Sequence, residues 1–168
     1  MACEAIKNAV AAEMTQPGGI EIGLAGGASG GDILFHEVCA ELGVPTQLML
    51  GLPRQDFVVA SVAPAGPRWI ERFDAIYAKP DRRELSDSAE LPRWLRGKAD
   101  YDVWRRNNLW MLHNALAHGP QRTTLIALWD GGKGDGPVGP NTWWRRRRNE
   151  AQKKIHLDTR ELFGLPKG

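Results

Sequence analysis

A glycine-rich stretch near the N-terminus carries the strongest chemical signal in the sequence. Residues 26–32 read Gly-Gly-Ala-Ser-Gly-Gly-Asp, and they follow a compact apolar run at residues 20–25. Glycine allows positive φ and lets the backbone approach a ligand without a Cβ in the way. Successive amides can then converge on an anion, assisted by the N-terminal dipole of a following helix. The stretch therefore predicts a phosphate-binding turn.

Six residues of this turn are candidates for ligand contact. Ser29 adds a hydroxyl donor to the amides, and Asp32 stands where it could cap the next helix or accept from a ribose hydroxyl. A tight strand-to-helix connection that binds nothing is the alternative, and it stays open. The candidates are Gly26, Gly27, Ser29, Gly30, Gly31 and Asp32.

A second glycine-rich loop, residues 130–140, follows another apolar run at residues 123–129. Its glycines could supply further phosphate-binding amides, Lys133 a counter-charge and Asp130 a contact to a ribose or base. A surface loop with solvated charges is the alternative. Two such loops at neighbouring strand ends suit the length of a nucleotide, so the ligand-binding candidates also include Asp130, Lys133, Gly136 and Gly139.

Several common chemistries are disfavoured. No Lys follows the first loop as in nucleoside triphosphatases, and no acidic residue ends the apolar run 46–50 as in dinucleotide-binding dehydrogenases. Ser61 lacks the G-x-S-x-G context of an acyl-transfer nucleophile. The histidines lack metal-ligand spacing and no C-x-x-C pair accompanies them, so we expect neither a metal nor a cofactor.

The elements that position the loops follow from hydrophobic periodicity. Ile33, Leu34, Val38 and Leu42 share one helical face, and the strand–turn–helix–strand order of residues 20–50 is a βαβ unit, which requires parallel strands. We predict an α/β fold, a Rossmann-like three-layer sandwich with a mainly parallel sheet of about five strands. Its other helices are expected at residues 1–16, 56–63, 68–77, 99–118 and 141–153, and its other strands at residues 82–86, 123–129 and 154–158. An N-terminal helix and linker, residues 1–19, would precede the ligand-binding domain, residues 20–168.

Length, charge and cysteine content set the broad class. A chain of 168 residues suits one domain with a substantial core. Residues 1–52 carry one Lys against six acidic residues, whereas residues 53–168 carry 21 basic against 14 acidic residues, which favours an anionic ligand. Cys3 and Cys39 are too few for a disulfide framework, and the inward-facing Cys39 should be a core thiol. No membrane-spanning run and no signal-peptide pattern is present, so we expect a cytoplasmic protein.

A run of four arginines at residues 145–148 raises the question of nucleic acid. Four consecutive side chains cover all sides of a helical turn, so they cannot all face one ligand. No base-stacking platform or nucleic-acid motif accompanies them, and we do not expect nucleic acid as a partner. Trp143 and Trp144 would pack inward or lie at a partner surface. A homo-oligomer and a fused or partner domain both stay open.

Several motifs in order resemble a known group of bacterial domains. They are the segment from Gly26 to Glu37, then Leu50-Gly-Leu-Pro53, then Phe57-x-x-x-Ser61-Val62, then Trp69-x-x-Arg72-Phe73. Over about residues 20–160 the chain resembles the Rossmann-like domains of the SLOG (DprA and Lonely Guy-like) superfamily, which are appended to tetratricopeptide-repeat proteins and nucleotide cyclases. The resemblance implies binding of nucleotides or nucleotide-derived signals. Some members are nucleotide phosphoribohydrolases.

The chain departs from the enzymatic members at the second loop. Those members carry P-G-G-x-G-T followed closely by a catalytic Glu, whereas this chain reads Gly136-Pro-Val-Gly139-Pro140 and its next acidic residue is Glu150. We therefore expect binding or sensing of a nucleotide or nucleotide-derived ligand. Cleavage of the N-glycosidic bond of a nucleoside monophosphate is the enzymatic alternative, with Asp32 and Asp130 as its candidate catalytic carboxylates. A protein-interaction module that uses Trp143, Trp144 and the arginine run is a further alternative.

Overall fold

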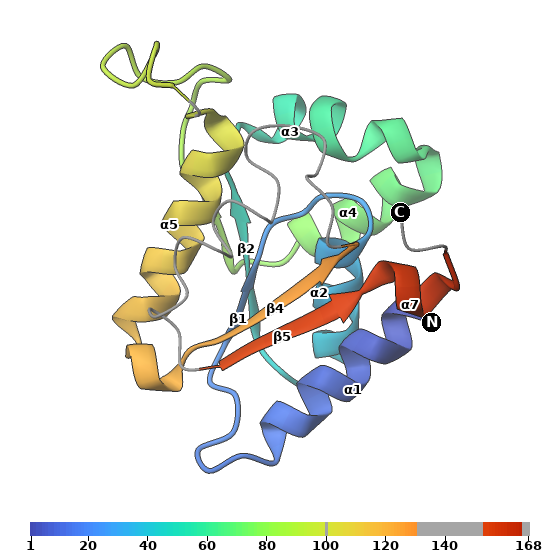
Figure 1. Cartoon of the computed structure of the whole chain (residues 1–168). Coiled ribbons are helices and arrows are strands. Elements are labelled where there is room, and N and C mark those ends of the chain that lie inside the picture. Colours follow the sequence, from blue (N-terminus) through green and yellow to red (C-terminus); the bar gives the residue numbers. More distant parts are fainter. Residues whose placement is uncertain (100, 131–152, 166–168) are drawn as a thin grey trace. The chain divides into compact units, whose positions relative to one another are not determined.

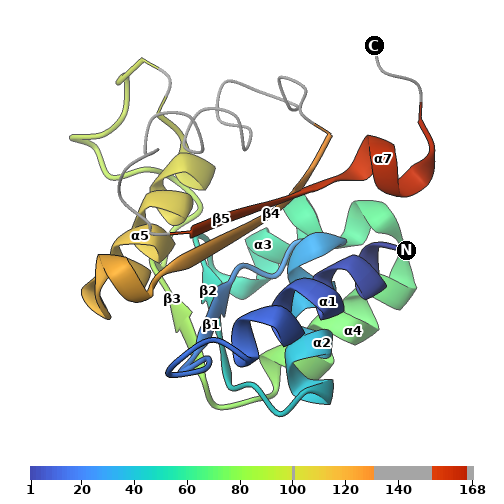
Figure 2. The same cartoon turned by 60° about the horizontal axis from the view of Figure 1, so that its bottom comes forward.

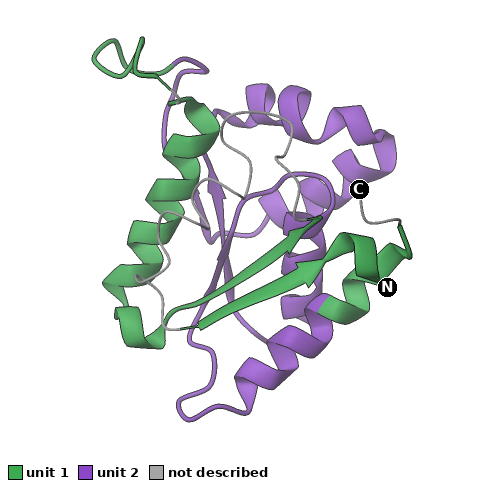
Figure 3. Cartoon of the chain, viewed as in Figure 1, with its two compact units in different colours: residues 1–5, 91–168 green, residues 6–90 purple. Residues whose placement is uncertain are grey.

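The computed structural model describes residues 1–99, 101–130 and 153–165. The chain divides into two compact units, one of residues 6–90 and the other of residues 1–5 with 91–168 (Figure 3). In helix α1 (Ala2–Met14), residues 2–5 belong to the unit that contains residues 91–168, and residues 6–14 belong to the unit of residues 6–90.

The unit of residues 6–90 is built on a parallel sheet of three strands. Their order is β1 (Gly23–Ala25), β2 (Thr46–Leu50) and β3 (Arg82–Glu84) (Figure 2). Gly23 lies opposite Thr46, and Leu48 lies opposite Arg82. Helix α2 (Gly31–Glu41) connects β1 to β2. Helix α3 (Arg54–Ser61), the short 3₁₀ helix η1 (Ala63–Ala65) and helix α4 (Pro67–Tyr77) connect β2 to β3. The predicted βαβ unit and its parallel strands are confirmed.

The burial of apolar side chains explains why these segments form strands and helices. Three successive residues of β2, Leu48 to Leu50, are inaccessible to solvent, as expected of a central strand covered on both faces. Helix α2 buries Ile33, Val38 and Cys39 against β1 and β2, and it lies beside α4 (Figure 2). The predicted core position of Cys39 is confirmed, and burial raises the pKa of its thiol to about 11.

The unit that contains residues 91–168 holds a second parallel pair of strands. Helix α5 (Val103–Ala117) begins at Asp102, whose carboxylate accepts from the Arg105 N–H at 2.8 Å. A short 3₁₀ helix, η2 (Pro120–Arg122), leads to β4 (Thr124–Trp129), which pairs along its whole length with β5 (Lys153–Asp158). The chain then turns into α7 (Thr159–Phe163), an element that the sequence did not indicate. The helix expected at residues 141–153 lies largely outside the described residues.

The α/β class is confirmed, and the strands are parallel, but the single sheet of about five strands is not what the described residues form. Three strands make one sheet and two make another, because β4 pairs with β5 and β1 pairs with β2. Strand β1 is also shorter than the predicted run 20–25, since its pairing with β2 begins at Gly23. Of the helices in the described part of the chain, none is long and apolar enough to cross a membrane.

Candidate functional site

The carboxyl ends of β1, β2 and β3 lie at one edge of their sheet because all three strands run in parallel. Residues 26–30 leave β1 at this edge and enter α2, and residues 51–53 leave β2 there and enter α3 (Figure 1). Ligands of open α/β sheets bind at this edge. The first glycine-rich stretch is therefore a strand-to-helix turn in the position that the sequence indicates.

Glycine is required at positions 26 and 27 because the protein's own side chains fill the space that a Cβ would occupy. A Cβ on Gly26 would stand 2.5 Å from Oδ2 of Asp32. A Cβ on Gly27 would stand 2.7 Å from the ring of Phe73 and 3.1 Å from Leu48. Both glycines are buried. In this structure their small size therefore serves internal packing.

Three consecutive peptide groups of the turn are each held by one hydrogen bond. The Gly26 carbonyl lies 3.0 Å from Nε2 of His36, on the second turn of α2. The Ala28 N–H donates to Oδ2 of Asp32 at 3.1 Å. The Ser29 N–H donates to the carbonyl of Ser61, the last residue of α3, at 2.9 Å. The backbone from Gly26 to Ser29 is thus fixed from two different helices.

The N–H groups that follow Ser29 are not held in this way by the described residues. Gly30 takes up φ 102° and ψ −122°, a conformation that only glycine adopts without strain, and no side chain caps the helix that follows. The first intrahelical bond runs from the Leu34 N–H to the Gly30 carbonyl. Within the described part of the chain, no acceptor is bonded to the N–H groups of residues 30–33. The start of α2 therefore presents three amide donors, those of residues 30–32, beside the half-buried Ser29, whereas Ile33 is fully buried. These three donors form the candidate site.

Burial next to the turn shifts the pKa values of two titratable side chains of α2. Desolvation raises the pKa of the Asp32 carboxyl, and the hydrogen bond from the Ala28 N–H offsets only part of that rise. Desolvation lowers the pKa of His36, with a smaller contribution in the same direction from Lys79, against the opposing effect of the Gly26 and Ala25 carbonyls. His36 is therefore a neutral ring at pH 7.

Helix α2 is held to α4 by a pair of complementary side chains. The Arg72 guanidinium donates through Nε to Oε1 of Glu37 at 2.7 Å and through its second nitrogen to Oε2. The same guanidinium lies 4.1 Å from the centre of the Trp69 ring. Such a two-pronged, stacked contact fixes the direction of the arginine more firmly than a single ion pair would. It anchors the helix whose N-terminus forms the candidate site.

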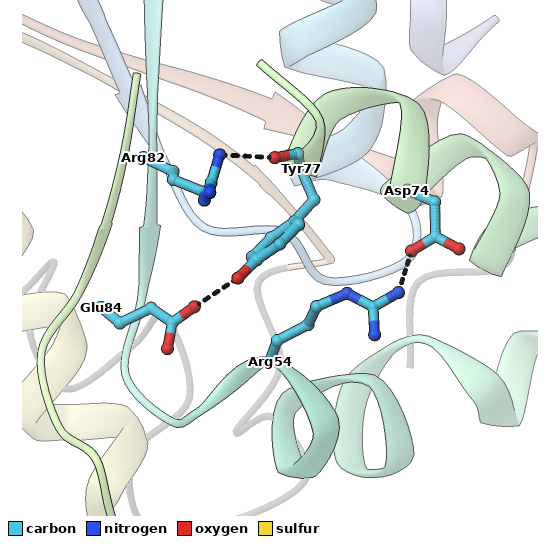
Figure 4. Close-up of polar contacts among 5 residues, drawn as sticks. All are labelled: Arg54, Asp74, Tyr77, Arg82 and Glu84. Atoms are coloured by element: carbon cyan, nitrogen blue, oxygen red, sulfur yellow. Dashed lines mark hydrogen bonds and ion pairs between the residues drawn. The ribbon is translucent and has the colours of Figure 1, made fainter. Parts of the chain in front are cut away.

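A surface cluster ties α3, α4 and β3 together. Arg54 pairs with Asp74 at 2.5 Å, and the Tyr77 hydroxyl donates to Glu84 at 2.8 Å (Figure 4). Arg82 donates to the Tyr77 carbonyl at 3.2 Å, and its guanidinium lies 4.7 Å from the centre of the Tyr77 ring. Arg54 and Asp74 pair with each other, and Tyr77 contacts both Glu84 and Arg82, so the cluster links the three elements.

The second set of predicted site residues is only partly described. Asp130 directly follows β4, and its carboxylate lies 3.5 Å from the guanidinium of Arg160 on α7. Lys133, Gly136 and Gly139 lie outside the described residues, as do Trp143, Trp144 and the arginine run at residues 145–148.

Sequence reasoning missed the residues that hold the turn. His36 had no metal-ligand partner in the sequence, and Ser61 had no catalytic context, yet both bond to the turn backbone. One signal was present: Asp32 and His36 are four residues apart, so they share the helix face next to the turn. Among the residues that the structure describes, no group of three or more His, Cys, Asp or Glu side chains is arranged to hold a metal ion.

The unit of residues 6–90 thus belongs to the class of parallel α/β structures with an open helix N-terminus at the carboxyl edge of the sheet. A scan against protein-family models finds no match for the chain. A search of curated proteins finds no significant match either.

Proposed function

We propose that the protein binds a nucleotide or nucleotide-derived ligand and that the N-terminus of α2 holds a phosphate group of that ligand. The observation that supports this is the set of three amide donors at residues 30–32, which lack acceptors within the described part of the chain and lie in residues that solvent reaches. They follow a turn whose three preceding peptide groups are already fixed. Donors fixed in advance bind an anion without a further loss of backbone entropy.

Charge and access both suit an anion at this place. The aligned peptide dipoles of an α-helix place about half a positive elementary charge at its N-terminus. The residues from Ser29 to Asp32 are only half-buried, so solvent reaches the turn. The Ser29 hydroxyl can add a fourth donor. Several donors that converge on one point match the several acceptor oxygens of a phosphate better than they match a single carbonyl oxygen.

Other parts of the proposal rest on the sequence alone. For Asp130, Lys133, Gly136 and Gly139, ligand contact is inferred from their glycine-rich loop. Membership of the SLOG superfamily is inferred from the ordered motifs between residues 26 and 73. A single Rossmann-like three-layer sandwich is likewise our proposal for the complete architecture, beyond the two parallel sheets described.

N-glycosidic hydrolysis of a nucleoside monophosphate is the second candidate. The raised pKa of Asp32 supports it, because a carboxyl that keeps its proton to higher pH beside a binding site can serve as a general acid. Incubation with AMP or CMP followed by chromatography tests it. Release of free base that is lost in Asp32→Asn would favour hydrolysis, whereas intact nucleotide would leave binding as the function.

Calorimetry with AMP, ADP, cyclic AMP, adenosine and inorganic phosphate tests binding itself. We expect heat with the phosphate-bearing ligands and a loss of at least about tenfold in affinity when phosphate is removed to leave adenosine. Amide chemical shifts should move at residues 30–32 when AMP is added.

Two matched glycine variants give the test its control. Gly30 and Gly43 both have positive φ, and a Cβ at either would meet open space, but Gly43 follows the opposite end of α2. Gly30→Ala should lower AMP affinity by about tenfold or more, and Gly43→Ala should leave it unchanged although both variants are strained. No heat with any ligand, or an equal effect of the two variants, would contradict the proposal.

A further inference from the structure

One buried polar side chain, His36, connects three parts of the unit of residues 6–90. It lies on α2 and is 1% exposed. Its Nδ1 lies 2.9 Å from Oγ1 of Thr46, the first residue of β2, and its Nε2 lies 3.0 Å from the Gly26 carbonyl oxygen. Both ring nitrogens therefore have partners, and both partners are on other elements.

The partners determine which nitrogen carries the hydrogen. A carbonyl oxygen can only accept, so Nε2 must donate to Gly26. In a neutral ring Nδ1 is then an acceptor, and the Thr46 hydroxyl donates to it. Burial favours the neutral ring. The hydrogen bonds thus select the Nε2–H tautomer of His36.

The bond to Gly26 also sets the direction of the peptide group that follows. The peptide bonds of the described chain are trans, so the Gly26 carbonyl and the Gly27 N–H belong to one plane and point in opposite directions. A carbonyl held by His36 therefore turns the Gly27 N–H away from the imidazole ring. The next two peptide groups are held by Asp32 and by Ser61, so His36 provides the first of three successive constraints that lead to the open donors of residues 30–32.

We propose that His36 is the positioning residue of the phosphate-binding turn, acting through the Gly26 carbonyl and touching no ligand itself. This inference rests on the proposed function. It differs from a general role in packing because only one of the two His36 hydrogen bonds leads to the turn. The bond to Thr46 stabilises the fold from the other side of the ring and gives an internal control.

Three variants in the full chain separate the two roles. In His36→Leu both bonds are lost, and we expect AMP affinity to fall by about tenfold or more. Thr46→Val removes only the Nδ1 partner, so AMP affinity should stay within about threefold of wild type even where unfolding shows lost stability. His36→Gln places an amide N–H near the position of Nε2, and it should restore most of the affinity that His36→Leu loses. Urea unfolding of each variant provides the comparison with stability.

The imidazole nitrogens give a readout that does not depend on the variants. Long-range ¹H–¹⁵N spectra of the wild type at pH 7 should show a neutral Nε2–H tautomer at His36. A charged ring or the Nδ1–H tautomer would overturn the inference, including where His36→Leu fails to fold. AMP affinities of His36→Leu and Thr46→Val that fall equally, in step with stability, would also overturn it.

The two proposals fail in different ways. If wild type binds neither AMP nor inorganic phosphate, the proposed function fails and the positioning role falls with it, whatever the tautomer. If wild type binds AMP and His36→Leu binds it equally well, only the positioning role is wrong.

Discussion

Replacing Gly27 by Ala tests whether this glycine is required by internal packing. The added Cβ would stand 2.7 Å from a ring carbon of Phe73 and 3.1 Å from Leu48. Ordinary carbon–carbon contacts lie at about 3.5–4.0 Å, so the ring would have to move by most of an ångström. Gly27 is not among the glycines with positive φ, so the expected cost is steric and carries no backbone strain.

The surroundings of Phe73 set the magnitude. The ring is inaccessible to solvent and is stacked against both Phe57 and Tyr77, with centroid separations of 5.9 and 5.8 Å. Overpacking of a filled core costs about 1–3 kcal/mol, and a fully buried ring with two stacked aromatic neighbours places Gly27→Ala in the upper half of that range. For a chain of this size the melting temperature should fall by about 4–12 °C.

Urea unfolding followed by tryptophan fluorescence measures this cost, and a double-mutant cycle assigns it. Phe73→Leu shortens the side chain that the new methyl group meets. The two substitutions together should therefore cost less than the sum of their separate effects, by about 1 kcal/mol or more. A Gly27→Ala variant that loses less than about 0.5 kcal/mol, or strictly additive effects in the cycle, would refute the packing argument.

Three further outcomes are expected. Because the pKa of Asp32 is raised in the folded state, the stability that its protonated carboxyl contributes is complete below pH 4 and is lost as pH rises through the folded pKa. The unfolding free energy of wild type should therefore fall relative to that of Asp32→Asn between pH 4 and 7, by at most about 1.4 kcal/mol per pH unit. A change of opposite sign would contradict the raised pKa. At pH 8 iodoacetamide should label the exposed Cys3 of the native protein and spare Cys39, whose thiol is buried with a pKa of about 11; equal labelling in peptide mass spectra would exclude the buried position. Arg72→Lys should lower the urea-unfolding free energy by about 1 kcal/mol, because lysine can neither form the two-pronged contact to Glu37 nor stack on the Trp69 ring in the same way. An unchanged unfolding curve would show that the contact adds no stability.

Local sequence rules predicted the elements of the unit of residues 6–90 well. The strand at residues 46–50 was predicted to the residue, and the helices after it were displaced by at most two residues. The strand ends just before Gly51, α3 begins just after Pro53, and α4 begins at Pro67 with Phe73 and Ile76 on its buried face, so neighbouring residues largely define these segments. The pairing of strands was less predictable, because a run of apolar residues such as 124–129 does not say which strand it will pair with.

The candidate site likewise has features that the sequence predicted and features that only the tertiary structure revealed. Composition and order alone predicted a turn at the carboxyl end of a parallel strand, because glycine allows the positive φ of a tight strand-to-helix connection. The structure forms it from residues 26–30, with Gly31 and Asp32 already in α2. Tertiary structure decided what each glycine is for: Gly26 and Gly27 make room for Asp32 and Phe73, and Gly30 supplies the positive φ. It also decided that a histidine ten residues later and a carbonyl from another helix would hold the turn. Those contacts depend on distances across the fold, which no local pattern encodes.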